Sequence, residues 1–126
     1  MIAYLDTHIA ALIAEGRKSR LSKEAIGLIN RADLLLSPMA LLELEYLYEI
    51  KRSRFPARDL FEKVAQEIGL RLCDLPFSTV AGAALNESWT RDPFDRMIVA
   101  QAKANGFAWL ITSDQQIPKH YPRAVW

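Results

Sequence analysis

Short, mainly apolar runs alternate along the chain with stretches in which apolar residues recur at helical spacing. An apolar run bounded by turn residues is typical of a strand buried on both faces. Strands are therefore expected over residues 2–5, 34–37, 70–75 and 107–112, with a short edge strand at 124–126. Helical periodicity and end signals predict helices over residues 8–15, 22–30, 38–52, 57–68, 78–87 and 93–105.

Alternation of strands and helices across one chain is typical of a parallel sheet with helices on both faces. We therefore predict the α/β class, as a three-layer α/β/α sandwich around a mainly parallel sheet of four to five strands. The chain has 126 residues, which is an ordinary size for one domain. Residues 1–126 are accordingly expected to form a single domain.

Composition narrows the class of protein. Hydrophobic residues make up 51% and charged residues 25% of the chain, which is typical of a globular protein. The net charge of +1 excludes the overall basic field that many nucleic-acid-binding proteins carry, so any such binding needs a local patch. Cys73 is the only cysteine and is expected to be a buried small hydrophobe. We expect a cytoplasmic protein that does not contact membranes, because neither a signal peptide nor an apolar run of about 20 residues is found.

The helix predicted from residue 93 carries two carboxylates near its start. Asp92 is well placed to cap it and Pro93 to occupy its first position. Asp95 projects on the same side as the apolar residues of the helix, whereas Arg96 and Lys103 take the other side. A carboxylate on a buried face needs a partner that offsets its desolvation. Asp95 alone is equally well explained as the reciprocal partner of Asp92 in a capping box.

Glu43 is a second inward-facing carboxylate, in the helix that begins at Pro38. Apolar residues surround it on the predicted packed face, namely Met39, Leu42, Tyr46, Leu47 and Ile50. Glu45 and Glu49 lie on the opposite, wet face. No lysine or arginine shares the face of Glu43, so a bound cation is the partner that its burial would require.

Two further aspartates follow predicted strands. Asp6 comes directly after the first strand and Asp114 after the strand over 107–112. In open α/β sheets, chemistry gathers beyond the carboxyl ends of the strands, and Asp95 would point toward that same edge. Each aspartate also has a simpler explanation, since Asp6 could cap a helix and Asp114 could be an ordinary turn residue.

Converging carboxylates repel one another unless a proton or a cation offsets their charge. Oxygen ligands alone suit Mg²⁺ or Mn²⁺. A zinc site is not expected, because the nitrogen and sulfur ligands are limited to His8, His120 and Cys73. A carboxylate pocket of this kind suits hydrolysis of phosphodiester bonds by water that the ion activates.

The chain resembles the PIN-domain family, specifically the VapC-type toxin ribonucleases of type II toxin–antitoxin systems, over essentially its full length. The most specific match is the run Asp-Pro-Phe-Asp-Arg at 92–96 leading into an apolar, alanine-containing helix. Three weaker matches stand in the expected order at residues 4–7, 37–44 and 110–114.

The resemblance implies a PIN-like fold and a metal-dependent endoribonuclease, with Asp6, Glu43, Asp95 and Asp114 as catalytic and metal-binding residues. Asp6 and Asp95 would be the surest ligands, and Asp114 is the more variable position in the family. Thr7 and Thr112 would be supporting hydroxyls. The resemblance also implies a substrate such as transfer or ribosomal RNA, a cognate antitoxin that obstructs the site, and a homodimer.

Surface residues give weaker indications of the RNA and protein contacts. Two basic clusters lie near residues 17–23 and 51–58. Clusters of this kind are more often solvated loops than RNA-binding sites. Arg96 suits a structural role or the rim of the pocket. Tyr46, Tyr48, Leu41 and Phe55 suit protein contacts and suit packing within the chain about equally well.

Two alternatives to a ribonuclease toxin remain. One is a PIN-like module that binds RNA or a protein without cleaving. The other is a receiver-like phosphate-handling α/β domain, which also gathers aspartates at strand ends. It is disfavoured because it has no role for Glu43 or for the helix that carries Asp95.

Overall fold

A computed structural model describes residues 1–126 and places the five strands in one wholly parallel sheet. The spatial order is β3-β2-β1-β4-β5, with bounds Arg71–Leu72, Asp33–Leu36, Ile2–Leu5, Trp109–Ile111 and Ala124–Val125. Leu5 of β1 is in register with Leu36 of β2 and Ile111 of β4. The carboxyl ends of the three central strands therefore meet at one edge of the sheet.

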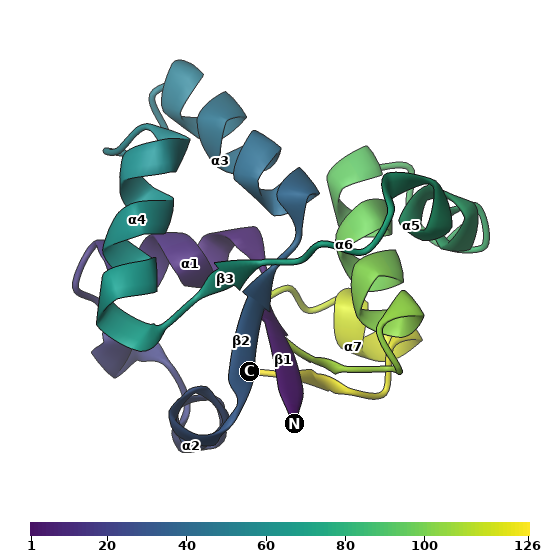
Figure 1. Ribbon diagram of the computed structural model, residues 1–126, viewed down its shortest axis with the longest axis horizontal. Helices are drawn as coiled ribbons and strands as arrows, with labels where there is room; N and C mark the ends of the chain where they lie inside the picture. The colour runs from purple at the N-terminus through teal and green to yellow at the C-terminus, as the bar shows by residue number, and fades with distance from the viewer.

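Helices cover both faces of the sheet, which confirms the predicted three-layer α/β class. Figure 1 shows α1, α2 and α4 on one side of the central strands and α5, α6 and α7 on the other. Their bounds, with the intervening α3 and the short 3-10 helix η1, are Thr7–Ala14 (α1), Lys18–Arg20 (η1), Lys23–Arg31 (α2), Pro38–Glu49 (α3), Ala57–Ile68 (α4), Phe77–Ala84 (α5), Pro93–Ala104 (α6) and Ile117–His120 (α7).

Several predicted ends shift for local reasons. The helix expected to reach residue 52 stops at Glu49, because Lys51 adopts a left-handed backbone with φ of 64°. The strand expected over 70–75 is reduced to Arg71–Leu72, an edge strand that pairs only with β2. The helix expected over 78–87 ends at Ala84, and the four-residue α7 was not predicted.

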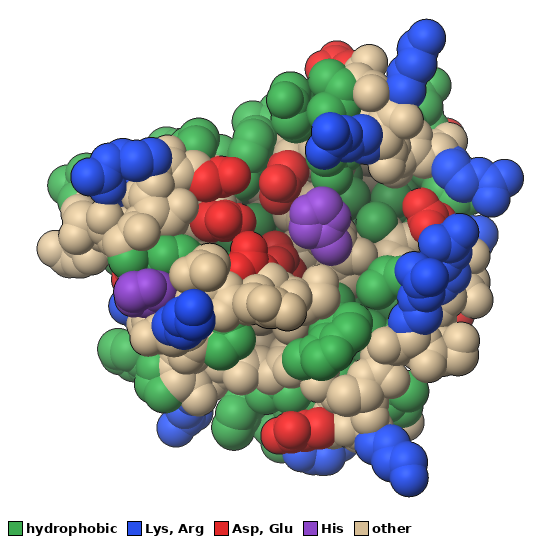
Figure 2. All heavy atoms as spheres, turned by 180° about the vertical axis from the view of Figure 1, so that it is seen from behind, with side chains coloured by type: hydrophobic (Ala, Val, Ile, Leu, Met, Phe, Trp, Pro, Cys, Tyr) green, Lys and Arg blue, Asp and Glu red, His purple; other side chains and the backbone are tan.

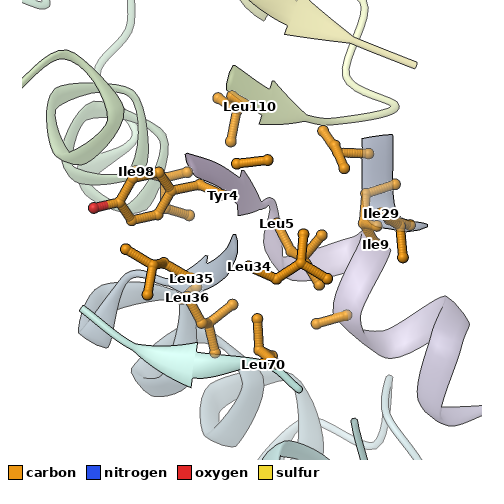
Figure 3. Packing of buried hydrophobic residues seen from close by; sticks show 14 of the residues in the cluster. Tyr4, Leu5, Ile9, Ile29, Leu34, Leu35, Leu36, Leu70, Ile98 and Leu110 are labelled. Atoms are coloured by element: carbon orange, nitrogen blue, oxygen red, sulfur yellow. The ribbon is translucent and has the colours of Figure 1, made fainter. Parts of the chain in front are cut away.

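The core is centred on β1, whose residues Ala3, Tyr4 and Leu5 are fully buried. Figure 3 shows the ring of Tyr4 directed toward Ile98 of α6, whereas Leu5 lies on the other side of the strand with Ile9 of α1. Burial on both faces is the reason that this strand is apolar throughout. No helix in the structure combines the length and the apolar character that crossing a membrane requires.

A buried polar network ties β1 to the helices that carry the acidic residues. Tyr4 donates its hydroxyl hydrogen to Cys73 Sγ at 3.0 Å and accepts a hydrogen bond from Asn105 Nδ2 at 2.7 Å. Gln101 Nε2 donates to the same sulfur at 3.2 Å, and Ser37 Oγ donates to Gln101 Oε1 at 3.0 Å. Cys73 is thus buried as predicted, but it also serves as a hydrogen-bond acceptor between α6 and the sheet.

Candidate active site

Asp6 occupies the junction between β1 and α1, at the carboxyl edge of the sheet. Its side chain is 4% exposed, and its Oδ1 accepts a hydrogen bond of 2.8 Å from the backbone N–H of Thr7. Its Oδ2 accepts a hydrogen bond of 2.6 Å from the hydroxyl of Thr112, which follows β4. Asp6 therefore does cap α1, and the same carboxylate is held by the neighbouring strand.

The Glu43 side chain is directed toward Thr7, next to Asp6. The prediction of which face of its helix is packed was wrong. The side chains of α3 that are fully packed are Ala40 and Leu44. By contrast, Leu42, Tyr46 and Ile50, which were expected on that face, are 57%, 49% and 43% exposed. The packed face lies further round the helix because α3 is in contact with α1, α4 and α6.

The Glu43 side chain itself is half-buried. It accepts a hydrogen bond of 2.5 Å at Oε1 from the Thr7 hydroxyl. Glu45, expected to face water, instead accepts a hydrogen bond of 3.0 Å from the Ala57 N–H at the start of α4. That bond supplies a cap that Pro56, which precedes α4, does not provide.

Asp95 stands in the first turn of α6 with its carboxylate free of any hydrogen bond or ion pair within the chain. Asp92 caps the helix as predicted, by accepting hydrogen bonds from the N–H groups of Phe94 at 2.8 Å and Asp95 at 3.2 Å. The reciprocal bond of a capping box is not formed, because the Asp92 N–H donates to Thr90 Oγ1 at 3.1 Å. The capping-box explanation of Asp95 is therefore excluded.

Burial and negative charge together raise the pKa of Asp95 to about 7. Burial is the largest cause, and the charges of Asp92, Asp6, Asp114 and Glu43 follow in that order. Such a shift is typical of a carboxylate that lacks a compensating cation. All the acidic residues predicted for the site thus act on this one group.

Asp114 lies in the turn after β4 and has a clear structural task. Its Oδ1 accepts hydrogen bonds from the N–H groups of Gln116 at 2.6 Å and Ile117 at 3.3 Å, at the start of α7. Its own N–H donates to Thr112 Oγ1 at 3.0 Å. Asp114 is therefore the turn residue that its sequence position predicts, and its charge also contributes to the raised pKa of Asp6 and of Asp95.

The cluster carries negative charge that the chain does not neutralise. Burial raises the pKa of Asp6 and of Glu43, and nearby carboxylates raise both further. The charge of His8 acts in the opposite direction on both residues. The ion pairs of the chain all lie elsewhere, joining Arg17 to Glu15, Lys18 to Glu67 and Lys103 to Glu87.

Figure 2 shows acidic side chains gathered in a hollow of the face opposite to that of Figure 1, with Lys and Arg side chains around the margin. A cavity of about 550 Å³ is a different feature. It lies between the starts of α3 and α4, and its lining includes Leu41, Leu42 and Arg58. None of the four acidic residues predicted for the site lines this cavity.

The donors of this site fit a hard divalent cation in kind, since they are carboxylates supported by hydroxyls. The partnerless Asp95 is the group that such a cation would neutralise. No three acidic, histidine or cysteine side chains, however, are placed to hold one ion together. Side chains such as Glu43, which now accepts a hydrogen bond from Thr7, would have to turn toward the ion.

Other residues considered from the sequence fall into structural roles. Arg96 Nε donates to the Thr90 carbonyl at 2.8 Å, so the predicted structural role of this arginine is confirmed. Tyr48 is exposed, whereas Leu41 and Phe55 are partly buried and pack against the core. In the cluster near residue 17, Arg17 and Lys18 pair with glutamates.

Sequence reasoning missed a second buried acid, Glu87, which is 2% exposed. It pairs with Lys103 and accepts a hydrogen bond of 2.7 Å from Trp89 Nε1. Trp89 also stacks on His120, with ring centroids 4.6 Å apart. These contacts hold the loop before α6 against the C-terminal segment. The only local sign of them is Trp89 itself, a large aromatic residue shortly before Asp92.

Comparisons with known proteins agree with this architecture. The PIN domain family matches residues 3–121. Ribonuclease VapC22 of Mycobacterium tuberculosis (strain ATCC 25618 / H37Rv) is 32% identical over 126 residues, a match that covers 96% of this chain and 94% of that protein.

Two solved structures share the fold at lower identity. The crystal structure of VapBC2 from Rickettsia felis, bound to a DNA fragment from their promoter, has a TM-score of 0.65 and 18% identity, and the match covers 99% of this chain and 96% of that one. A toxin–antitoxin complex from Klebsiella pneumoniae has a TM-score of 0.63 and 16% identity, with 98% and 96% covered.

Proposed function

This chain belongs to the PIN-domain family, and on that premise we propose that it is a metal-dependent endoribonuclease toxin. Support comes from the relative named a ribonuclease, which matches almost the entire chain. The reaction is the addition of water across one phosphodiester bond of RNA. Structured RNA, such as transfer or ribosomal RNA, is the substrate class that we propose.

The observation that carries the proposal is the state of Asp95. A half-buried carboxylate without a partner, with its pKa raised to about 7 by burial and four neighbouring acids, is costly to keep. Such perturbed groups gather at functional sites, where a cation or substrate makes use of them. The unfavourable free energy of this carboxylate is therefore best explained by a cation that binds beside it in the active protein.

We assign the ligand role first to Asp6 and Asp95, with Glu43 and Asp114 as further acidic residues of the site. Mg²⁺, or Mn²⁺ in its place, would supply Lewis-acid stabilisation of the phosphate and a more acidic water. Thr112 and the Thr7 N–H fix the Asp6 carboxylate in place. Thr7 also holds Glu43 through its hydroxyl, which keeps that carboxylate beside Asp6, where it can orient a water.

We further propose a cognate antitoxin as the protein partner and a homodimer as the form of the toxin. The support for the antitoxin is that solved structures with this fold include toxin–antitoxin and VapBC complexes; the homodimer is proposed from the family resemblance alone. A reading frame for a small antitoxin should adjoin the gene. Expression of this chain alone should arrest growth, and co-expression of the neighbour should relieve the arrest; harmless expression of a lone gene would contradict the toxin role.

Incubation of the purified protein with end-labelled RNA tests the enzymatic proposal. Cleavage is expected with Mg²⁺ or Mn²⁺ and should stop when EDTA is added. The Asp6→Ala variant serves as the matched control for a contaminating nuclease, because it should be inactive after the same purification. Cleavage that persists in EDTA, or in that variant, would contradict the metal mechanism.

A PIN module that binds RNA or a protein without cleaving is the second candidate. It is favoured by one observation, that no three potential ligands are placed to hold an ion together. The same incubation separates the two candidates, since a binding module would retain RNA and leave it intact with either metal.

A further inference from the structure

Two aromatic side chains stand beside the acidic cluster and belong to the two helices that bring carboxylates to it. Tyr46 follows Glu43 by about one turn of α3, and Phe94 directly precedes Asp95 in α6. Their ring centroids are 6.2 Å apart with an angle of 27° between the planes. This separation and angle are within the range of a stacked aromatic pair.

The pair is placed where a substrate passing the carboxylates would meet it. The contact between Tyr46 of α3 and Phe94 of α6 shows that the two helices approach each other at this point. Tyr46 is 49% exposed although Phe94 covers part of it. One side of the Tyr46 ring is therefore supported by protein while much of the remainder is open to solvent.

Burial in the core does not account for this tyrosine. Its hydroxyl takes part in no hydrogen bond within the chain, and the packed residues of α3 are Ala40 and Leu44. A rigid, supported and exposed ring is the kind of surface on which unpaired nucleotide bases stack. Binding of a phosphate would need only the Tyr46 hydroxyl, whereas the supported ring face is suited to a base.

We propose that Tyr46, supported by Phe94, forms a stacking site for one unpaired base of the RNA that flanks the scissile phosphate. This inference rests on the proposed function, because it takes RNA as the ligand. It adds that the nucleotide next to the cleaved bond is single-stranded and extruded from any helix. An aromatic ring can stack on any base, so the site selects for an unpaired nucleotide more than for a particular base.

Binding of a short unstructured RNA oligonucleotide with a fluorescent 5′ label, measured by anisotropy in EDTA, tests the stacking site without hydrolysis. Tyr46→Ala is expected to weaken binding by about 5- to 100-fold, whereas Tyr46→Phe keeps the ring and should bind like the original chain. Tyr48→Ala is the matched control. Tyr48 is a 40% exposed tyrosine of the same helix, placed about 200° round the axis from Tyr46.

A set of oligonucleotides with one abasic position each identifies the stacked base. At one position, removal of the base should abolish the difference between the original chain and Tyr46→Ala. In Mg²⁺, Tyr46→Ala should raise KM for RNA and leave kcat largely unchanged. A purely structural role would give no dependence on an individual base.

The stacking site and the proposed function fail in different ways. If RNA binds through Tyr46 but is never cleaved, the proposed ribonuclease activity is contradicted and the stacking site is still supported. If Tyr46→Ala cleaves RNA as well as the original chain, the stacking site alone is overturned. The same holds if Tyr48→Ala weakens RNA binding as much as Tyr46→Ala does. A changed oligomeric state of Tyr46→Ala with unchanged RNA binding would assign the ring to a protein contact and also overturn it.

Discussion

The hydroxyl of Thr7 donates a hydrogen bond of 2.5 Å to Oε1 of Glu43, across 36 positions of sequence. The backbone N–H of the same threonine donates to Asp6 at 2.8 Å. One residue thereby fixes two carboxylates, from the end of β1 and from α3. The acidic cluster is held together through this small residue, although its members repel one another.

Replacement of Thr7 should therefore affect activity more than folding. Thr7→Val removes the hydroxyl and keeps the backbone bond to Asp6, so Glu43 is left unrestrained. We expect a loss of about 10- to 100-fold in cleavage rate, while Thr7→Ser should retain most of the rate. Initial rates on labelled RNA measure the difference, and equal rates for the valine and serine variants would contradict the role of the hydroxyl.

Replacement of Thr112 should act on stability as well. Its hydroxyl donates to the buried Asp6 and accepts from the Asp114 N–H. Thr112→Val leaves both groups without this partner, at an expected cost of about 1–3 kcal/mol in the free energy of unfolding. Thr112→Ser keeps the hydroxyl and serves as the control in urea denaturation; an unchanged free energy in the valine variant would show that the bond is unimportant.

The metal-free protein should lose stability as the pH rises toward neutrality. The folded state holds a proton on Asp95 up to a pKa of about 7, while the ordinary pKa is 3.8. Between these values the folded state binds more protons than the unfolded state, so the free energy of unfolding falls as the pH rises. The stabilisation by the proton on Asp95 is complete below pH 3.8 and is lost by about pH 7. The raised pKa values of Asp6 and Glu43 act in the same direction.

Thermal unfolding in EDTA measures this pH dependence. The midpoint should be higher at pH 5.5 than at pH 7.5, and Asp95→Asn should reduce the difference because its side chain cannot ionise. A midpoint that rises with pH, by the same amount in both proteins, would contradict the raised pKa of Asp95.

Addition of Mn²⁺ or Mg²⁺ should restore the stability lost at neutral pH. A cation that binds only the folded state raises the unfolding midpoint, and protons compete with it for the same carboxylates. We expect a larger shift of the midpoint at pH 7.5 than at pH 5.5, and little shift for Asp95→Asn. Asp59→Asn changes an exposed carboxylate outside the acidic cluster and should respond like the original chain. Equal shifts in all three proteins would indicate non-specific binding.

The elements with local signals were predictable from sequence. Asp92 and Pro93 begin α6 as expected, Ser22 caps α2, and Gly69 ends α4 in the left-handed conformation with φ of 74°. Caps and stops depend on a few neighbouring residues, so they can be recognised without the fold. The same local pattern placed Asp6 and Asp114 after strands whose carboxyl ends meet.

The features that depend on distant contacts were not predictable. The apolar residues of α3 suggested a packed face that the structure leaves largely exposed, because contacts with α1, α4 and α6 select a different face. Glu87 is buried through Lys103 and Trp89, and only the tertiary structure brings Lys103 to it. Glu43 contacts Thr7, next to Asp6, although the packed face from which its inward direction was predicted is wrong.

The proposed role of Asp95 as a metal ligand can be tested by comparing the cleavage rates of Asp95→Asn and Asp92→Asn at saturating Mg²⁺. The two aspartates begin the same helix, but Asp92 is a cap, and asparagine caps about as well as aspartate. We expect Asp92→Asn to cleave labelled RNA at close to the original rate. For Asp95→Asn we expect a loss of at least about 100-fold; equal rates for the two variants would contradict the role of Asp95 as a metal ligand.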